Sequence, residues 1–162
     1  MNAAKRYLDE FSPQRRFHRF ERKRTHLVSS VFSVAKQPGG LWQLMLGARV
    51  QVFAIEESSH FEAWLRFLLA AQRTKQPVFV EWNEQRLVER VLPVLRTQIR
   101  SVGDPMPDGR VPVFFRASPA PYHLRASNPE YRIIRQRLEE VQANDPYVLV
   151  TVDPNHEIVS VD

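Results

Sequence analysis

The chain has 162 residues, of which 43% are hydrophobic and 25% charged, a composition typical of one globular domain. It contains no cysteine, which excludes disulfides, iron–sulfur clusters, thiolate zinc sites and cysteine nucleophiles. No stretch approaches the ~20 apolar residues that span a bilayer, and no apolar signal core follows the first basic residues, so we expect a soluble cytoplasmic protein with no membrane span.

The formal net charge of +5 is concentrated at the start of the chain. Residues 1–26, here the N-terminal arm, hold eight lysines and arginines against three acidic residues, and the rest of the chain is balanced. Cations interleaved with aromatic rings suit a polyanion, because the cations neutralise phosphates while the rings stack on bases. The candidate contact residues are Arg15, Arg16, Phe17, Arg19, Phe20, Arg22, Lys23 and Arg24. The alternative is a solvated leader whose phenylalanines pack against the body of the protein.

The first half of the chain predicts strands around one helix. Alternating and β-branched residues, separated by turn residues, predict strands over 27–34, 41–46, 49–55, 78–82 and 86–92. Between the third and fourth strands, apolar residues at helical spacing predict a helix of about four turns that runs to Lys75. Ser59 and Glu62 have the spacing of a capping box, which predicts the start of this helix.

The second half follows the same plan. Its predicted strands cover 97–102, 110–117, 122–124, 147–152 and 157–161. The helix between them has the capping-box spacing at Ser127 and Glu130, and its apolar face is Tyr131, Ile134, Leu138 and Val141. Pro112 lies inside a predicted strand and has no backbone N–H to donate, so we expect that strand to lie at a sheet edge.

The similarity of the two halves predicts the architecture. Residues 99–102 match residues 31–34, and the spacing from Gly40 to Ile55 equals that from Gly109 to Leu124. We therefore predict an α+β fold of two tandem pseudo-symmetric strand-helix-hairpin repeats, ββαββ in outline, with mostly antiparallel sheet. The repeats cover 27–94 and 95–162, form one compact domain, and follow the basic arm. The alternative is one closed or partly closed barrel shared by both copies.

The first predicted helix is apolar around most of its circumference, unlike the second, which carries several arginines and glutamates. Such a helix must be covered on both sides. Trp64, Phe67 and Leu68 are therefore candidates for an apolar interface. The cover is supplied by the N-terminal arm, by a second copy in a homodimer, or by a partner protein.

Catalytic chemistry finds little support in the sequence. The five histidines lie in the arm or beside turns, and none has the spacing of paired metal ligands. Glu56, Glu57 and Glu81 end neighbouring predicted strands, and a metal-dependent hydrolase using them is a minor alternative. We assign no catalytic residue, metal or cofactor, and an enzyme is the minority hypothesis.

Two function classes remain. In the first, the protein is a non-enzymatic adaptor or assembly module that docks on a larger protein or nucleoprotein through its arm and its apolar helix. In the second, it binds nucleic acid directly and without sequence specificity, and Arg96, Arg100 and Arg110 add a stripe of cations on the body. Salt distinguishes the two, because phosphate contacts weaken steeply as salt rises and apolar contacts do not.

Overall fold

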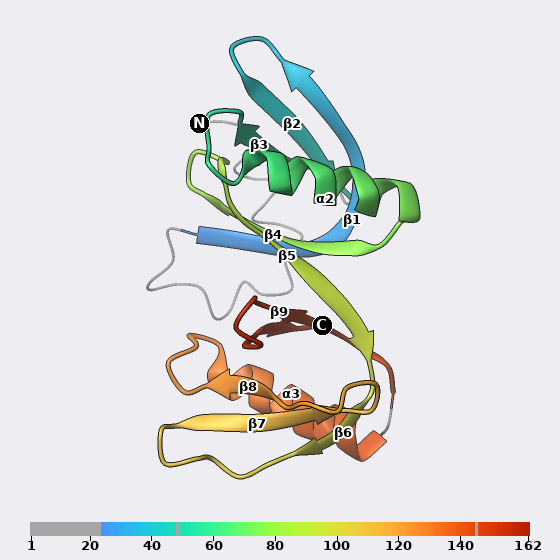
Figure 1. Ribbon diagram of the computed structural model, residues 1–162, viewed down its shortest axis with the longest axis vertical. Coiled ribbons are helices and arrows are strands. Elements are labelled where there is room, and N and C mark those ends of the chain that lie inside the picture. The colour runs from blue at the N-terminus through green and yellow to red at the C-terminus, as the bar shows by residue number, and fades with distance from the viewer. Residues whose placement is uncertain (1–23, 48, 145) are drawn as a thin grey trace.

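The computed structural model describes residues 24–47, 49–144 and 146–162 and is an α+β structure whose described strands are mostly antiparallel (Figure 1). The elements are β1 (Arg24–Gln37), β2 (Leu41–Leu46), β3 (Val50–Ile55), α2 (Phe61–Thr74), β4 (Pro77–Asn83), β5 (Val88–Thr97), β6 (Ile99–Val102), β7 (Arg110–Phe115), β8 (Tyr122–Arg125), α3 (Tyr131–Asn144), β9 (Val148–Val152) and β10 (Ile158–Val161). Neither of these two helices is long and apolar enough to cross a membrane.

One long strand connects the two halves of the molecule. Up to Pro93, β5 pairs with β4, and from Val94 to Thr97 it pairs with β9. A seven-stranded sheet, in the order β10-β9-β5-β4-β1-β2-β3, therefore runs through both halves, and β6-β7-β8 form a second sheet. We call residues 24–92 the first lobe and 94–162 the second lobe (Figure 1). The expected repeat boundary after residue 94 lies inside β5, where its pairing partner changes.

In the first lobe the sheet curves into a partly closed barrel. β1 pairs with β4 through its first half and with β2 through its second, and a bulge between Val31 and Ser33 follows the change of partner. The barrel closes where β3 meets the start of β5, through a parallel bridge between Phe53 and Leu87. There the Phe53 amide donates a hydrogen bond of 2.9 Å to the carbonyl of Arg86.

The second lobe closes in the same way. The end of β5 continues into β6, which has a bulge between Ile99 and Ser101 and pairs with β7. A parallel bridge joins His123 to Glu157, and the His123 amide donates to the carbonyl of His156 at 3.0 Å. Each lobe thus has its own barrel, in place of one barrel shared by both halves, and three strand segments precede each helix where the ββαββ outline has two.

Each helix packs on strands of its own lobe. α2 contacts β1 and β4, and α3 contacts β6, β8 and β10. The predicted face of α3 is confirmed, since Ile134, Leu138 and Val141 are buried and Tyr131 packs against them. Apart from Phe79 and Leu92, the buried apolar side chains of the described residues form two clusters, one in each lobe, with no member in common.

Both predicted capping boxes are wrong. The residue before α2 is His60, whose backbone is itself helical, and no side chain caps the helix there. The Phe61 amide donates instead to the carbonyl of Ser58 at 3.0 Å, so the preceding turn runs directly into the helix. At the start of α3, Asn128 accepts the amide of Glu130 at 2.8 Å, so the side chain used is not that of Ser127.

The edge position predicted for Pro112 is also wrong, because β7 is the middle strand of its sheet. Pro112 is tolerated because β6 ends at Val102, so no strand residue needs its missing N–H. The Pro112 carbonyl accepts the amide of Gly103 at 2.8 Å, just beyond that strand end.

Candidate nucleic-acid interface

A row of exposed polar side chains follows the outside of the second lobe. Along β5 and β6, Thr97 and Ile99 are buried. Because successive side chains of a strand point to opposite faces, Arg96, Gln98 and Arg100 lie on the outer side of the same stretch of chain. Both arginines are exposed, and neither forms an ion pair with another described residue.

Each of these two arginines stands over an aromatic ring. The guanidinium carbon of Arg96 is 4.9 Å from the ring centre of Tyr147, and that of Arg100 is 5.2 Å from the ring centre of Phe114. Tyr147 is 61% exposed, so its ring is accessible to a ligand. Such cation–π contacts hold a planar cation and a ring together in a form that can accept a stacked base.

The outer face of β7 and β8 extends this surface. Val111 and Val113 point into the core, so Arg110 and Phe114 point outward on β7, and Arg110 is paired in register with Arg125 of β8. His123 lies on the same face of β8. We call this surface the arginine face; it comprises Arg96, Arg100, Arg110, Phe114, His123, Arg125 and Tyr147.

Two carboxylates neutralise part of the arginine face. The backbone amide of Arg110 donates to the Asp108 carboxylate at 3.1 Å and its side chain donates at 2.6 Å, and these two hydrogen bonds hold the pKa of Asp108 below its usual range. Arg125 pairs with Glu157. Arg96 and Arg100 are therefore the cations of this face that are most available to an anionic ligand.

In the first lobe, the outer face of β2 and β3 carries no charged side chain among the described residues. This face and the adjoining part of β1 present uncharged side chains, including Phe32, which is 73% exposed, and Ile55, which is 37% exposed. Gln37, Gln43, Met45, Gln51 and Phe53 complete this face, opposite the core residues of β2 and β3. The outer face of β2 and β3 thus differs in charge from the outer face of β7 and β8.

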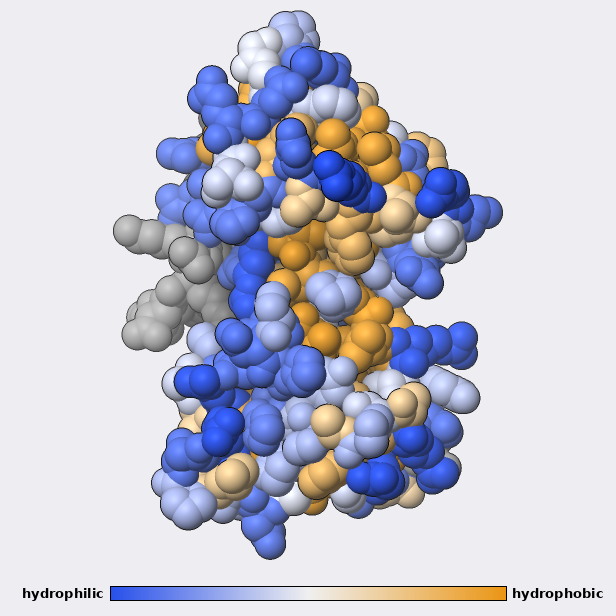
Figure 2. Space-filling model, viewed as in Figure 1, coloured by the Kyte–Doolittle hydropathy of each residue, from blue (hydrophilic) through white to orange (hydrophobic). Residues whose placement is uncertain are grey.

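The apolar-interface residues predicted on α2 are separated by the structure. Leu68 is buried in the core of the first lobe, Trp64 is partly buried against that core, and Phe67 is 36% exposed. Phe67 borders a groove of about 130 Å³ with Thr74, Pro77, Pro93 and Val94. Figure 2 shows apolar side chains gathered over α2 and across the middle of this side of the molecule.

The acidic residues considered for hydrolysis have separate environments. Glu56 lies beside Gly40 and pairs with Lys36 at 3.1 Å, whereas Glu81 lines a cavity between the lobes. Within residues 24–47, 49–144 and 146–162, no group of three or more histidines or carboxylates is placed to hold a metal ion.

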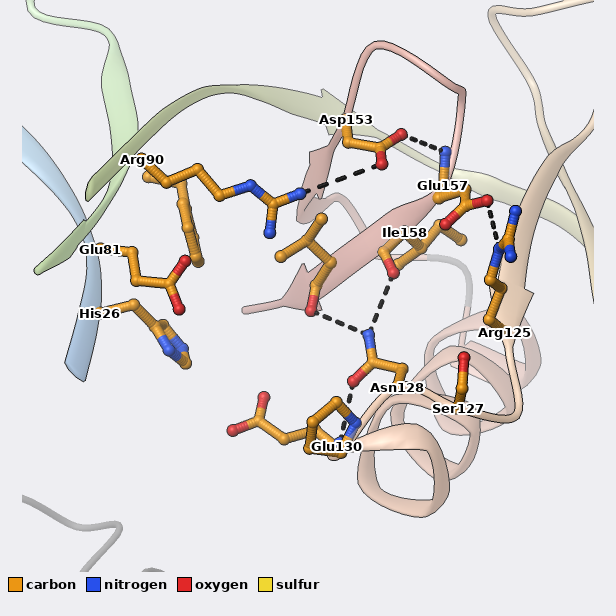
Figure 3. A pocket seen from close by; sticks show the side chains of 13 residues that line it. His26, Glu81, Arg90, Arg125, Ser127, Asn128, Glu130, Asp153, Glu157 and Ile158 are labelled. Atoms are coloured by element: carbon orange, nitrogen blue, oxygen red, sulfur yellow. Dashed lines mark hydrogen bonds and ion pairs between the residues drawn. The ribbon is translucent and has the colours of Figure 1, made fainter. Parts of the chain in front are cut away.

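The cavity between the lobes has a volume of about 530 Å³ (Figure 3). His26, Phe79, Glu81 and Arg90 contribute from the first lobe. The second lobe contributes the link between β8 and α3, including Asn128 and Glu130, and the region of β10. Asn128 donates to the carbonyls of Ile158 and Val159 at 3.2 and 3.3 Å, which covers part of the β10 backbone.

The predicted contact residues of the N-terminal arm from Arg15 to Lys23 lie outside the described residues. Arg24 begins β1, where its backbone is in register with Asn83 of β4.

No family model matches the chain, and no curated protein or solved structure matches it either.

The sequence indicated the arginines of the interface but not their aromatic partners. Phe114 belongs to β7 and Tyr147 directly precedes β9, and only the pairing of β5 with β9 and of β6 with β7 brings these rings beside Arg96 and Arg100. The one feature of the sequence that could have indicated such a ring is Tyr147, which directly follows Pro146 at the start of a predicted strand.

Proposed function

We propose that the protein binds single-stranded nucleic acid through the arginine face of its second lobe. The observation that carries the proposal is the pair of neighbouring cation–aromatic contacts, Arg96 with Tyr147 and Arg100 with Phe114. In such a contact the arginine neutralises a phosphate while the ring stacks on a base, the combination by which proteins hold single strands without sequence readout.

The strand arrangement supports this proposal. In each lobe a long bent first strand pairs with the second and fourth strands, a helix lies between the third and fourth, and the third meets the fifth in parallel. This is the arrangement of the oligonucleotide-binding barrel, which binds its ligand on the face of strands 2 and 3 and beside the loops that flank them. In the second lobe that face is formed by β7 and β8, which carry Arg110, Phe114, His123 and Arg125.

The proposal includes the pseudo-symmetric tandem repeat expected from the sequence. It is supported by two turns of identical hydrogen bonding, 83–87 and 153–157, in which Arg86 and His156 both have φ 61°. The helices start 70 residues apart, at Phe61 and Tyr131. A glutamine of each helix also bonds to the backbone of a bulged strand. Gln72 of α2 donates to the carbonyl of Phe32 in β1, and Gln142 of α3 accepts the amide of Val102 in β6.

The test measures the affinity of the full chain for a fluorescent single-stranded oligonucleotide and for the same sequence as a duplex. We expect preference for the single strand and a steep loss of affinity with salt. Tyr147→Ala and Phe114→Ala should each cost about 1–3 kcal/mol of binding free energy, because each removes a stacking ring. Arg96→Gln should reduce the slope of log affinity against log salt by about 0.7.

Matched controls come from surfaces outside the arginine face. Phe32→Ala removes an exposed ring of the first lobe and Arg132→Gln an exposed cation of α3, and neither should change affinity. If binding is absent, or if it depends on the basic residues before Arg24 and not on Tyr147 or Phe114, the proposal is wrong.

A second candidate is the adaptor or assembly function, in which the protein docks on a larger protein or nucleoprotein. The groove beside Phe67 supports it, because exposed apolar side chains continue across that side of the molecule. Phe67→Glu should then reduce the native size of the complex that the protein forms in a cell extract, with little dependence on salt. Arg66→Glu, on an exposed position of the same helix, is the matched control.

A further inference from the structure

The outer face of β2 and β3, together with the adjoining second half of β1, is here called the neutral face. β2 lies between the other two strands. Gln43, near the middle of β2, is in register with Ala35 of β1 and with Phe53 of β3. At one end of β2 and β3, Leu41 is in register with Ile55, which is 37% exposed. The neutral face thus combines apolar side chains with an amide near its centre.

Charged side chains border the neutral face. Lys36 belongs to β1 but points to the opposite side of the sheet, where its ammonium group lies 5.9 Å from the ring centre of Trp42 and pairs with Glu56 at 3.1 Å. Arg86 lies along the edge of β3, where its guanidinium group donates to the carbonyl of Gln51 at 3.0 Å. An uncharged centre with aromatic and methionine side chains, surrounded by a polar rim, is the composition of a protein–protein interface.

The uncharged centre of the neutral face indicates which partner fits it. A twofold contact brings the same surface of two copies together, so a charged side chain near the axis meets its own copy. On the outer face of β7 and β8, such a contact would oppose Arg110 and Arg125 to the same arginines of a second copy. The neutral face avoids this repulsion. The amide of Gln43 suits a position near the axis, because it has both donors and an acceptor and can bond to its own copy.

We propose that two copies of this chain associate through their neutral faces, with the twofold axis near Gln43. Met45, Phe53 and Ile55 bury their exposed surface against the second copy, and this burial stabilises the dimer through the hydrophobic effect. The association does not depend on nucleic-acid binding, which is proposed for the arginine face of the second lobe. It also does not use the groove beside Phe67.

The test measures the molar mass of the full chain by analytical ultracentrifugation at concentrations up to about 100 µM, where we expect the wild type to be a dimer. Gln43→Glu and Gln43→Lys should each weaken the association by at least about 100-fold, because each places two like charges at the axis. An equimolar mixture of the two variants should form a dimer again, because opposite charges then meet there. Ile55→Glu, at an exposed position of the same face, should also dissociate the dimer.

The matched control is Gln76→Glu, which makes the same exchange at an exposed position beside the groove of Phe67. It should leave the mass of the dimer unchanged. A wild type that stays a monomer at about 100 µM would overturn the proposal, as would a dimer that persists in both Gln43→Glu and Ile55→Glu. A dimer that Gln76→Glu dissociates would also overturn it, because the copies then meet at the groove. Circular dichroism identifies a Gln43 variant that fails to fold, and Ile55→Glu then decides the outcome.

Discussion

Single residues in this structure hold backbone conformations that the side chain opposes, and Lys75 is the simplest example. It ends α2 with φ 57°, in the left-handed region, and its amide donates to the carbonyls of Ala71 and Gln72. Glycine adopts this conformation without steric cost, so Lys75→Gly should raise the free energy of unfolding by up to about 1 kcal/mol. Urea unfolding measures the change. Lys75→Ala keeps the Cβ and should bring no comparable gain; equal effects of the two substitutions would contradict the argument.

Gly103 illustrates the opposite case, a position where space and not backbone angle requires glycine. A Cβ there would lie 2.7 Å from Cγ of Pro112 and 3.3 Å from the Pro112 carbonyl oxygen. Gly103→Ala should therefore lower the free energy of unfolding by about 1–3 kcal/mol through overpacking. In a Pro112→Ala background the nearest atom is gone, so the same substitution should cost clearly less. An equal cost in both backgrounds, measured by urea unfolding, would rule out the contact as its cause.

Among the elements, the two hairpin turns before the last strand of each lobe offer a direct comparison. Oδ1 of Asn83 accepts the amides of Gln85 and Leu87, and Oδ1 of Asp153 accepts those of Asn155 and Glu157, all at 2.8–3.0 Å. Asn83→Ala and Asp153→Ala should each destabilise the protein by about 1–3 kcal/mol, because two amides lose their acceptor. The exchanges Asn83→Asp and Asp153→Asn keep the oxygen and should cost much less. Thermal unfolding checks both; alanine variants as stable as the exchanges would contradict the role of that oxygen.

The sequence predicted the helices and strands better than the way in which the strands close into barrels. Periodicity placed the first helix to within a residue or two of its end at Thr74, and identified the buried face of α3, because both depend on local spacing. The closure of the barrels was not predictable from the sequence. Each barrel closes through one parallel bridge between distant residues, Phe53 with Leu87 and His123 with Glu157, and such a bridge leaves no local sequence pattern. The capping boxes failed because other groups of the preceding turns supply the acceptors, the carbonyl of Ser58 before α2 and the side chain of Asn128 before α3. At the interface, arginines were visible in the sequence, whereas their rings depended on strand pairing.

For the molecule as a whole, charged side chains are unevenly distributed even where their numbers balance. Beyond the N-terminal arm, basic and acidic residues are equal in number. The second lobe nevertheless places two arginines without a described ion-pair partner on its outer surface, while the cavity between the lobes holds an excess of carboxylates. The outer surface of the second lobe and the cavity between the lobes therefore differ in the sign of their charge.

The separate cores predict that the two lobes open as distinct units. Leu138 is fully buried in the cluster of the second lobe, and no residue of that cluster belongs to the cluster of the first. Leu138→Ala should lower the opening free energy by about 2–5 kcal/mol for amides of α3 and β9, because it leaves a cavity in their core. Native-state hydrogen exchange of β2 and β3 should change far less, since only the short pairing of β5 with β9 continues the sheet between the lobes. Leu68→Ala, at the buried position of the first lobe, should produce the reverse pattern. If either variant lowers the opening free energy of both lobes equally, the molecule unfolds as one unit and β5 couples the two lobes.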